Sequence, residues 1–206
     1  PRTAGTSLAG QVVGSGIVVD VSKYFNQVLE VNQEENWVKV QPGVIRDDLN
    51  RHLRPFDLYF GPETSTANRA MIGGMVGNNS CGSNSVVYGS TRDHLIEVSG
   101  FLSDGSEVTF SNLTAEEFER KTGLDSLEGE LYRNINEILS PKENRRLIAK
   151  EFPKPSIPRR NTGYAIDLLA INQPFTKSGE SFNFCKLIAG SEGTLMFITE
   201  IKLSTI

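Results

Sequence analysis

The chain has 206 residues, with 25 acidic and 21 basic side chains, a formal net charge of -4 and 38% apolar residues. This length is enough for one domain with a substantial core. No apolar run reaches the roughly 18 residues of a membrane-spanning helix. Lys and Arg are not clustered, which argues against a nucleic-acid partner. Two cysteines and two histidines, at no metal-ligand spacing, predict neither a disulfide framework nor a metal site and favour a cytoplasmic location.

The first ten residues are small and rich in turn formers. Glycines and hydroxyls in residues 1–10 are typical of a turn whose backbone N–H groups converge on an anion, although ordinary turns without a ligand fit equally well. Gly5 and Gly10 have the spacing of a Walker loop, but no Lys follows, and Gly14-x-Gly16 leads into a β-rich run, so both common nucleotide signatures fail. Because the chain begins with Pro1 and shows no signal peptide, we expect a piece of a longer protein.

Short strands and one helix are predicted next. β-branched or alternating runs bounded by turn residues predict strands at 16–20, 27–31 and 37–41. Apolar residues spaced three or four apart predict a helix over 44–53, which Pro55 ends.

A long segment of small residues follows. Residues 61–91 carry only two charged side chains, so we expect neither a solvated loop nor a regular helix there. Paired glycines beside apolar residues suit a backbone that lies close to a flat ligand, with Asn and Ser side chains at a polar ring edge. The alternative is a loop packed closely on another loop.

The second half begins with a predicted hairpin, because runs at 95–102 and 107–110 flank an Asp-Gly turn. Residues 111–160 hold 19 charged side chains among 50 and predict a solvent-facing helical insertion. Its helix-compatible runs are 115–121, 127–139 and 143–150. With the β-rich run at 195–203, these elements predict an α+β fold, a mostly antiparallel sheet flanked by helices.

Five motifs together resemble a known family. They are residues 1–10, residues 61–65, residues 71–82 with Tyr88-Gly89, the turn Leu102-x-Asp104-Gly105, and residues 190–195. Their order and spacing resemble the PCMH-type FAD-binding domain of the vanillyl-alcohol oxidase and p-cresol methylhydroxylase superfamily. Within it, the chain is similar to the FAD-linked D-2-hydroxyacid dehydrogenases. Residues 159–167 (RRNTGYAID) further resemble the large bacterial branch linked to D-2-hydroxyglutarate.

The resemblance implies a domain organisation and a reaction. Residues 1–206 would be the second subdomain of the FAD-binding fold, with 111–160 as an insertion and with an N-terminal βαβ subdomain and a C-terminal cap domain outside this chain. A hydride would pass from C2 of a D-2-hydroxyacid of the lactate, glycolate or 2-hydroxyglutarate type to flavin N5, and a quinone or an electron-transfer protein would accept the electrons. The family's catalytic groups lie in the cap, so no catalytic residue is assigned here. Neither His52 nor His94 matches a flavin-attachment motif, which implies non-covalent FAD.

The resemblance also assigns cofactor contacts. The first motif would wrap the pyrophosphate, the second would lie along the flavin and ribityl portion, and the third would line the cofactor. The fifth motif and the strand after it would return near the adenosine and pyrophosphate portion. In that order, the assigned residues are Arg2, Thr3, Ala4, Gly5, Thr6, Ser7 and Gly10; Pro62, Glu63 and Ser65; Ile72, Gly73, Gly74, Gly77, Asn78, Asn79 and Gly82; and Glu192, Gly193, Thr194 and Ile198. Thr3 replaces a glycine usual in the first motif, which puts a strained backbone angle there in question. A non-catalytic nucleotide-binding module and an alcohol or sugar oxidase of the same superfamily stay open as alternatives.

Overall fold

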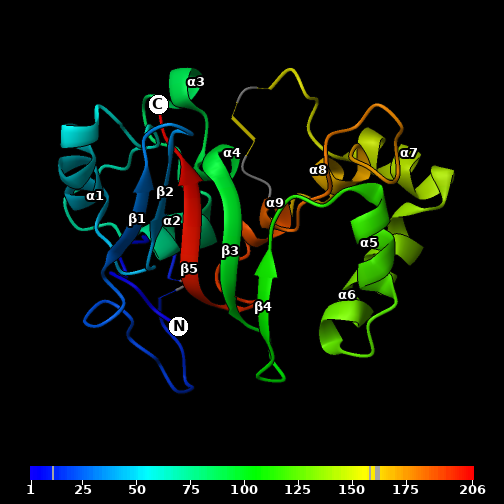
Figure 1. The fold of residues 1–206 in the computed structure, drawn as a ribbon, viewed down its shortest axis with the longest axis horizontal. Coiled ribbons are helices and arrows are strands. Elements are labelled where there is room, and N and C mark those ends of the chain that lie inside the picture. Colours follow the sequence, from blue (N-terminus) through cyan, green and yellow to red (C-terminus); the bar gives the residue numbers. More distant parts are fainter. Residues whose placement is uncertain (11, 158, 161–162) are drawn as a thin grey trace.

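An antiparallel sheet forms the centre of the molecule (Figure 1). The structure is a computed structural model that describes residues 1–10, 12–157, 159–160 and 163–206. Its strands are β1 (Val28–Asn32), β2 (Trp37–Val40), β3 (Leu95–Phe101), β4 (Glu107–Phe110) and β5 (Phe197–Ser204). They lie in the order β1-β2-β5-β3-β4, and every neighbouring pair is antiparallel. The predicted α+β fold is confirmed. Asn161 and Thr162, in the motif at 159–167, lie outside the described residues.

Helices lie beside the β1 edge of the sheet, behind it and beyond its β4 edge (Figure 1). They are α1 (Arg46–Leu53), the 3-10 helix η1 (Arg54–Phe56), α2 (Ile72–Asn78), α3 (Ser85–Tyr88), α4 (Thr91–His94), α5 (Ala115–Thr122), α6 (Leu127–Leu139), α7 (Lys142–Glu151), α8 (Ile166–Ala170) and α9 (Cys185–Ile188). Within the described ranges, no helix is long and apolar enough to cross a membrane.

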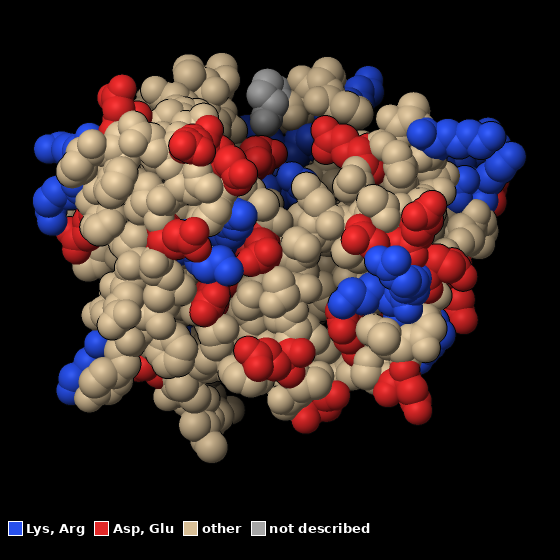
Figure 2. Space-filling model, viewed as in Figure 1, with Lys and Arg blue, Asp and Glu red and all other residues tan. Residues whose placement is uncertain are grey.

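The two faces of the sheet differ in chemistry because side chains alternate along each strand. Val38 and Ile201 point to the buried face and are fully inaccessible. On the opposite face, the Lys39 Nζ of β2 lies 3.1 Å from the Glu97 carboxylate of β3 and 3.5 Å from the Glu200 carboxylate of β5. Figure 2 shows charged side chains of both signs gathered over this part of the sheet. One face therefore carries the core and the other faces solvent.

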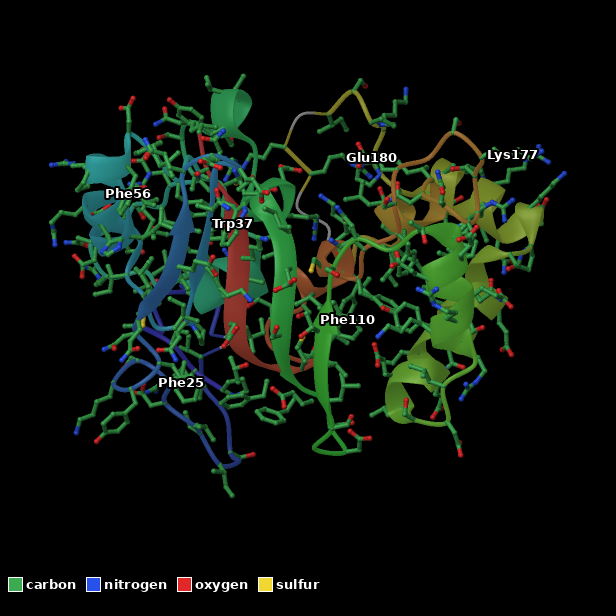
Figure 3. The ribbon with its side chains drawn as sticks, viewed as in Figure 1. Phe25, Trp37, Phe56, Phe110, Lys177 and Glu180 are labelled. Carbon is green, nitrogen blue, oxygen red and sulfur yellow. The ribbon has the colours of Figure 1, made fainter. Side chains whose placement is uncertain are left out.

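The predicted helical runs at 115–121, 127–139 and 143–150 are confirmed as α5, α6 and α7, but only α7 lacks a buried residue. Phe118 of α5 packs edge-on against Phe182 at 4.8 Å between ring centroids, and Tyr132 of α6 lies 4.8 Å from Phe184. Phe110 of β4, labelled in Figure 3, joins this aromatic cluster at 5.3 Å from Phe184. The cluster ties the charged segment to the sheet, so α5 and α6 are solvent-facing on one side only.

Two local predictions are wrong. Residues 16–20 form no strand, because only Asp20 bridges to another segment, at Arg2, and Ile17 is 96% exposed. A β-branched run without a neighbouring strand has no partner for its backbone hydrogen bonds. Residues 61–91 do contain a regular helix, α2, because Ile72 and Met75 anchor it in the core despite its glycines.

Candidate cofactor site

A groove of about 490 Å³ lies between the N-terminal loop, helix α2 and the segment that leads into β5. Its volume falls within the roughly 300–1,000 Å³ typical of cofactor and ligand sites. Fourteen of the 21 residues assigned from the sequence line it: Arg2, Thr3, Ala4, Gly5, Thr6, Ser7, Ser65, Gly73, Gly74, Gly77, Asn78, Glu192, Gly193 and Ile198. Segments far apart in the sequence thus meet at one surface.

The backbone of the N-terminal loop lines one side of this groove. Arg2 N–H donates to Val19 O at 2.8 Å, and Arg2 O accepts from Val21 N–H at 3.0 Å, which fixes the start of the loop. Among the described residues other than Glu192, by contrast, none accepts a hydrogen bond from the backbone N–H groups of residues 3–10. Such donors need water or an anionic acceptor, and a glycine at φ +64°, Gly5, turns the chain between them. The loop therefore fits a diphosphate.

Charge in the groove is sparse. Arg2 is the one guanidinium among its described lining residues, and it already pairs with Asp20 at 3.3 Å. Since Glu192 also lines the groove, an anion there would depend mainly on backbone N–H groups, as in nests that bind phosphate without a lysine.

Thr3 replaces the family glycine without strain. It is absent from the described non-glycine residues with positive φ. A Cβ added at Gly74 would lie 2.5 Å from Thr3 Oγ1, so the threonine side chain occupies space that the glycine in α2 leaves free. Gly74 in helix α2 thus makes room for the threonine that replaces a glycine in the loop.

The end of helix α2 is joined to the segment that returns toward β5. Glu192 N–H donates to Gly77 O at 2.9 Å, and Gly190 N–H donates to Val76 O at 3.0 Å. These carbonyls belong to the last turn of a helix, which otherwise leaves its acceptors unpaired. Glu192 and Gly193 reach this position with consecutive left-handed angles, φ +53° and +75°. The two segments thus form one wall of the groove.

Some of the glycines serve packing instead. A Cβ at Gly73 would lie 2.5 Å from Pro42 Cβ, and one at Gly82 would lie 2.3 Å from Glu63 O. Contacts below 3.0 Å cannot be accommodated against backbone or a rigid ring. The alternative of close chain packing therefore holds at Gly73 and Gly82. At Gly77, which lines the groove, an added Cβ would meet the backbone of Glu192 at an ordinary 3.6 Å, and the approach of a flat ligand there stays a prediction.

Seven assigned residues lie outside the groove: Gly10, Pro62, Glu63, Ile72, Asn79, Gly82 and Thr194. Ile72 is buried in the core, and Pro62 is buried with its carbonyl accepting from Arg46 Nε at 3.1 Å. Gly10 is exposed beyond the groove, and the Thr194 hydroxyl lies 2.5 Å from Tyr164 Oη.

Glu63 and Gly82 line a second cavity of about 450 Å³ that adjoins the groove. The residues common to both are Thr64, Ser65, Asn78 and Ser80. The Glu63 carboxylate accepts from Asn84 Nδ2 at 2.9 Å, which fixes its position at the wall. Asn79 lines a third cavity, which shares Cys81 and Arg159 with the second.

Several groove residues escaped the sequence prediction. Thr66 Oγ1 donates to Thr6 Oγ1 at 3.3 Å and so ties the second motif to the first. The hydroxyl-rich run at 64–66 was the available signal for it. Pro42 and Met196 carry no such signal, since only the tertiary fold brings them to the groove.

Comparisons with known proteins agree with this geometry. The FAD binding domain family matches residues 1–111. D-2-hydroxyglutarate dehydrogenase of Escherichia coli (strain K12) is 39% identical over 203 residues, which are 98% of this chain and 19% of that protein. The mitochondrial cytochrome D-lactate dehydrogenase of Kluyveromyces lactis is 34% identical over 112 residues, 52% of this chain and 19% of that protein. The chain thus spans about a fifth of the length of these curated relatives.

A solved structure supports the fold. Alkyldihydroxyacetonephosphate synthase superposes with a TM-score of 0.60 at 18% sequence identity, covering 100% of this chain and 26% of that one. The N-terminal loop and the glycines of helix α2 fit a dinucleotide, although Thr3 stands where a glycine is usual. FAD is the cofactor for which the matching family is named. By its match over more than half of its length, the chain belongs to the FAD binding domain family.

Proposed function

We propose that this chain is the FAD-binding part of a flavin-dependent dehydrogenase that oxidises the C2 hydroxyl of a D-2-hydroxyacid of the 2-hydroxyglutarate, lactate or glycolate type. The observation that carries the proposal is the 39% identity, over 98% of the chain, to a D-2-hydroxyglutarate dehydrogenase. The groove supports it, since fourteen of the assigned residues line one continuous surface.

FAD, when bound, supplies the acceptor for the hydride that leaves C2 of the substrate. The residues of this chain hold the cofactor and shape its surroundings. Backbone N–H groups of residues 3–9 would donate to the diphosphate, and the groove-lining residues of helix α2 would lie against the cofactor. The buried packing of α2 against the core keeps this helix rigid, which a cofactor site needs in order to hold its reactive atom in place.

The cofactor is held without a covalent bond in this proposal. Neither histidine lines the groove: His52 stacks on Phe56, and both ring nitrogens of His94 lie within hydrogen-bond distance of backbone carbonyls, those of Tyr88 and Ser204. Catalytic groups and the substrate-binding cap lie outside residues 1–206, as does a βαβ subdomain that covers the other side of FAD. A chain that spans a fifth of its relatives supports this division.

Residues 111–160 form a helical insertion within this domain. The family match ends at residue 111, and the D-lactate dehydrogenase match covers only 52% of the chain, whereas the D-2-hydroxyglutarate dehydrogenase match covers 98%. We place the enzyme in the cytoplasm, with a quinone or an electron-transfer protein as acceptor; two free, buried cysteines are consistent with a reducing compartment.

The test uses the full-length protein. Denaturation should release FAD, and anaerobic addition of a D-2-hydroxyacid should bleach the visible flavin absorption, while the L-enantiomer leaves it unchanged. Protein without flavin would indicate a non-catalytic nucleotide-binding module. Bleaching by alcohols or sugars, with peroxide formed in air, would indicate an oxidase of the same superfamily. Either result would overturn the proposal.

A further inference from the structure

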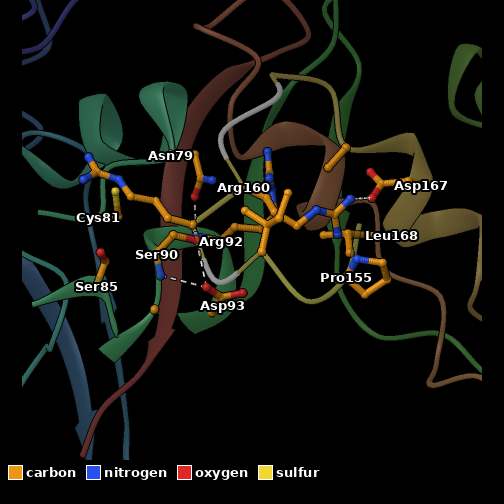
Figure 4. A pocket seen from close by; sticks show the side chains of 14 residues that line it. Asn79, Cys81, Ser85, Ser90, Arg92, Asp93, Pro155, Arg160, Asp167 and Leu168 are labelled. Carbon is orange, nitrogen blue, oxygen red and sulfur yellow. Dashed lines mark hydrogen bonds and ion pairs between the residues drawn. The ribbon is translucent and has the colours of Figure 1, made fainter. Parts of the chain in front are cut away.

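The third cavity, here called the basic pocket, has about 180 Å³ and lies between helix α4, the described residues at 155–157, 159–160 and 165–168, and the C-terminal end of α2 (Figure 4). We propose that it binds the distal carboxylate of a dicarboxylic substrate, the group that 2-hydroxyglutarate has and lactate lacks. This inference rests on the proposed function and adds a specificity site within the chain. The residues that carry it are Asn79, Arg92, Arg159, Arg160 and Asp167.

Unpartnered polar atoms converge on this pocket. Only four buried side-chain nitrogen or oxygen atoms in the described ranges lack a hydrogen-bond partner, and three of them belong to lining residues: Asn79 Nδ2, Arg160 Nε and Asp167 Oδ1. Buried polar groups in proteins are nearly always bonded, so each exception calls for a partner. Two of the three are donors, which match the two oxygens of a carboxylate.

The orientation of Asn79 is fixed by its neighbour. Its Oδ1 accepts from the Arg92 backbone N–H at 2.9 Å, and because that group can only donate, the opposite side of the amide must be the nitrogen. Asn79 is 99% buried, and Figure 4 shows this nitrogen on the side facing Arg160. A donor that is shielded from bulk water therefore points into the cavity.

The charge balance also favours an anion. Arg92 is 97% buried, and the side-chain hydrogen bonds of its guanidinium go to the backbone carbonyls of Ala189 and Gly163 rather than to a carboxylate. Burial lowers its pKa to about 10, Asp93 opposes this effect and Arg160 adds to it. Asp93 is engaged by the Ser90 backbone and hydroxyl.

Two further arginines complete the pocket. Arg160 pairs with one oxygen of Asp167, and Arg159 is exposed at the rim. The lining thus contains three arginines and two aspartates, Asp93 and Asp167, which gives it a net positive charge. Such a site favours an anion, because a buried charge without a counterion is costly. Figure 2 shows basic side chains at the bottom of a hollow between the sheet and the helical lobe.

The position fits a substrate group next to the cofactor. The groove shares lining residues with the second cavity, and the second cavity shares Cys81 and Arg159 with the basic pocket. The second cavity is lined by Glu63 and Ser65, which the resemblance assigns to the flavin and ribityl portion. A ligand carboxylate in the basic pocket would therefore lie beyond the flavin end of the groove, away from the diphosphate loop.

The experiment uses the full-length flavoprotein with three variants. Asn79→Asp keeps the shape and the bond to Arg92 N–H but replaces the inward donor by a charged oxygen. Arg159→Gln removes an exposed charge and should leave folding intact. Arg146→Gln, in exposed helix α7, is the matched control. Each is measured for flavin content, for KM and kcat with D-2-hydroxyglutarate and D-lactate, and for glutarate affinity by calorimetry.

We expect Asn79→Asp to raise both the KM for D-2-hydroxyglutarate and the dissociation constant of glutarate by at least about tenfold, as for loss of a charge-assisted hydrogen bond, and Arg159→Gln to raise them severalfold. For Arg159→Gln, the KM for D-lactate and the flavin content should stay within about twofold of wild type, and so should every value for the control. Equal effects on both substrates, or no effect of Arg159→Gln on glutarate binding, would mean a pocket that holds structural water only. A wild-type flavin that no D-2-hydroxyacid reduces would instead reject the proposed function, while glutarate binding would still decide the pocket.

Discussion

The sharpest prediction concerns Gly77→Ala, because the folding and the cofactor-binding effects should have opposite signs. Gly77 lies in α2, where alanine is favoured over glycine by roughly 0.5–1 kcal/mol. The new Cβ would lie 3.6 Å from Glu192 Cα, an ordinary van der Waals contact, so the protein itself offers no clash. The apoprotein should therefore be slightly more stable, or at least unchanged.

The same methyl would project at the wall of the groove. If FAD lies against Gly77, overpacking costs about 1–3 kcal/mol, which corresponds to a dissociation constant about five- to 150-fold higher. The assay removes FAD from the full-length protein, measures the melting temperature of the apoprotein and titrates FAD back by fluorescence quenching. Gly14→Ala is the control, since its Cβ would meet nothing within 4 Å and it lies outside the groove. A Gly77→Ala protein that binds FAD within twofold of wild type would refute the contact.

Two stability predictions follow from the core. Phe118→Ala should cost about 3–5 kcal/mol in urea unfolding, because it removes a fully buried ring from the aromatic cluster, and the folded fraction should bind FAD as wild type does. Burial raises the pKa of the Cys185 thiol, so the native state keeps a proton that the unfolded state releases above its ordinary pKa of about 8.5. The contribution of the thiol to stability is then complete below that pH and declines as the pH rises. The free energy of unfolding of Cys185→Ala should therefore fall less steeply between pH 8 and 10 than that of wild type. The same pH dependence in both proteins would contradict the assignment.

Strand and helix patterns were predictable where burial is local. Alternation at 37–41 and the Asp-Gly turn at 103–106 led directly to β2 and to the hairpin, in which Gly105 has φ +83°. Where tertiary contacts decide the secondary structure, the sequence pattern predicted it wrongly. The run at 16–20 has strand composition but no adjacent strand, and the glycines of α2 lower its helix propensity by about 1 kcal/mol each while the core packing of Met75 overrides them.

The groove shows the same division. The sequence alone indicated an anion-binding turn at 1–10, but ordinary turns without a ligand fitted equally well. Only the family resemblance grouped this turn with the distant segments that line the same groove. The basic pocket was not predicted as a site. The motif at 159–167 contains Arg160, but Arg92 and Arg160 are separated by 67 intervening residues and meet only through the path of the chain. Motifs whose members are contiguous can be recognised in a sequence, whereas sites assembled across a fold need coordinates.

The C-terminal end of helix α2 explains how both sites can depend on so few residues. Gly77 faces the groove, and two residues later Asn79 ends the helix with φ +52°, an angle that asparagine tolerates better than most side chains. Its backbone N–H donates to Val76 O at 3.0 Å, while its side-chain amide turns toward Arg92 and the basic pocket. This turn therefore needs both Gly77, which has no side chain, and Asn79, which has a short polar one. If both proposals hold, this single turn sets the distance between the cofactor and the distal carboxylate of the substrate, so a substitution that shifts α2 should impair both binding events together.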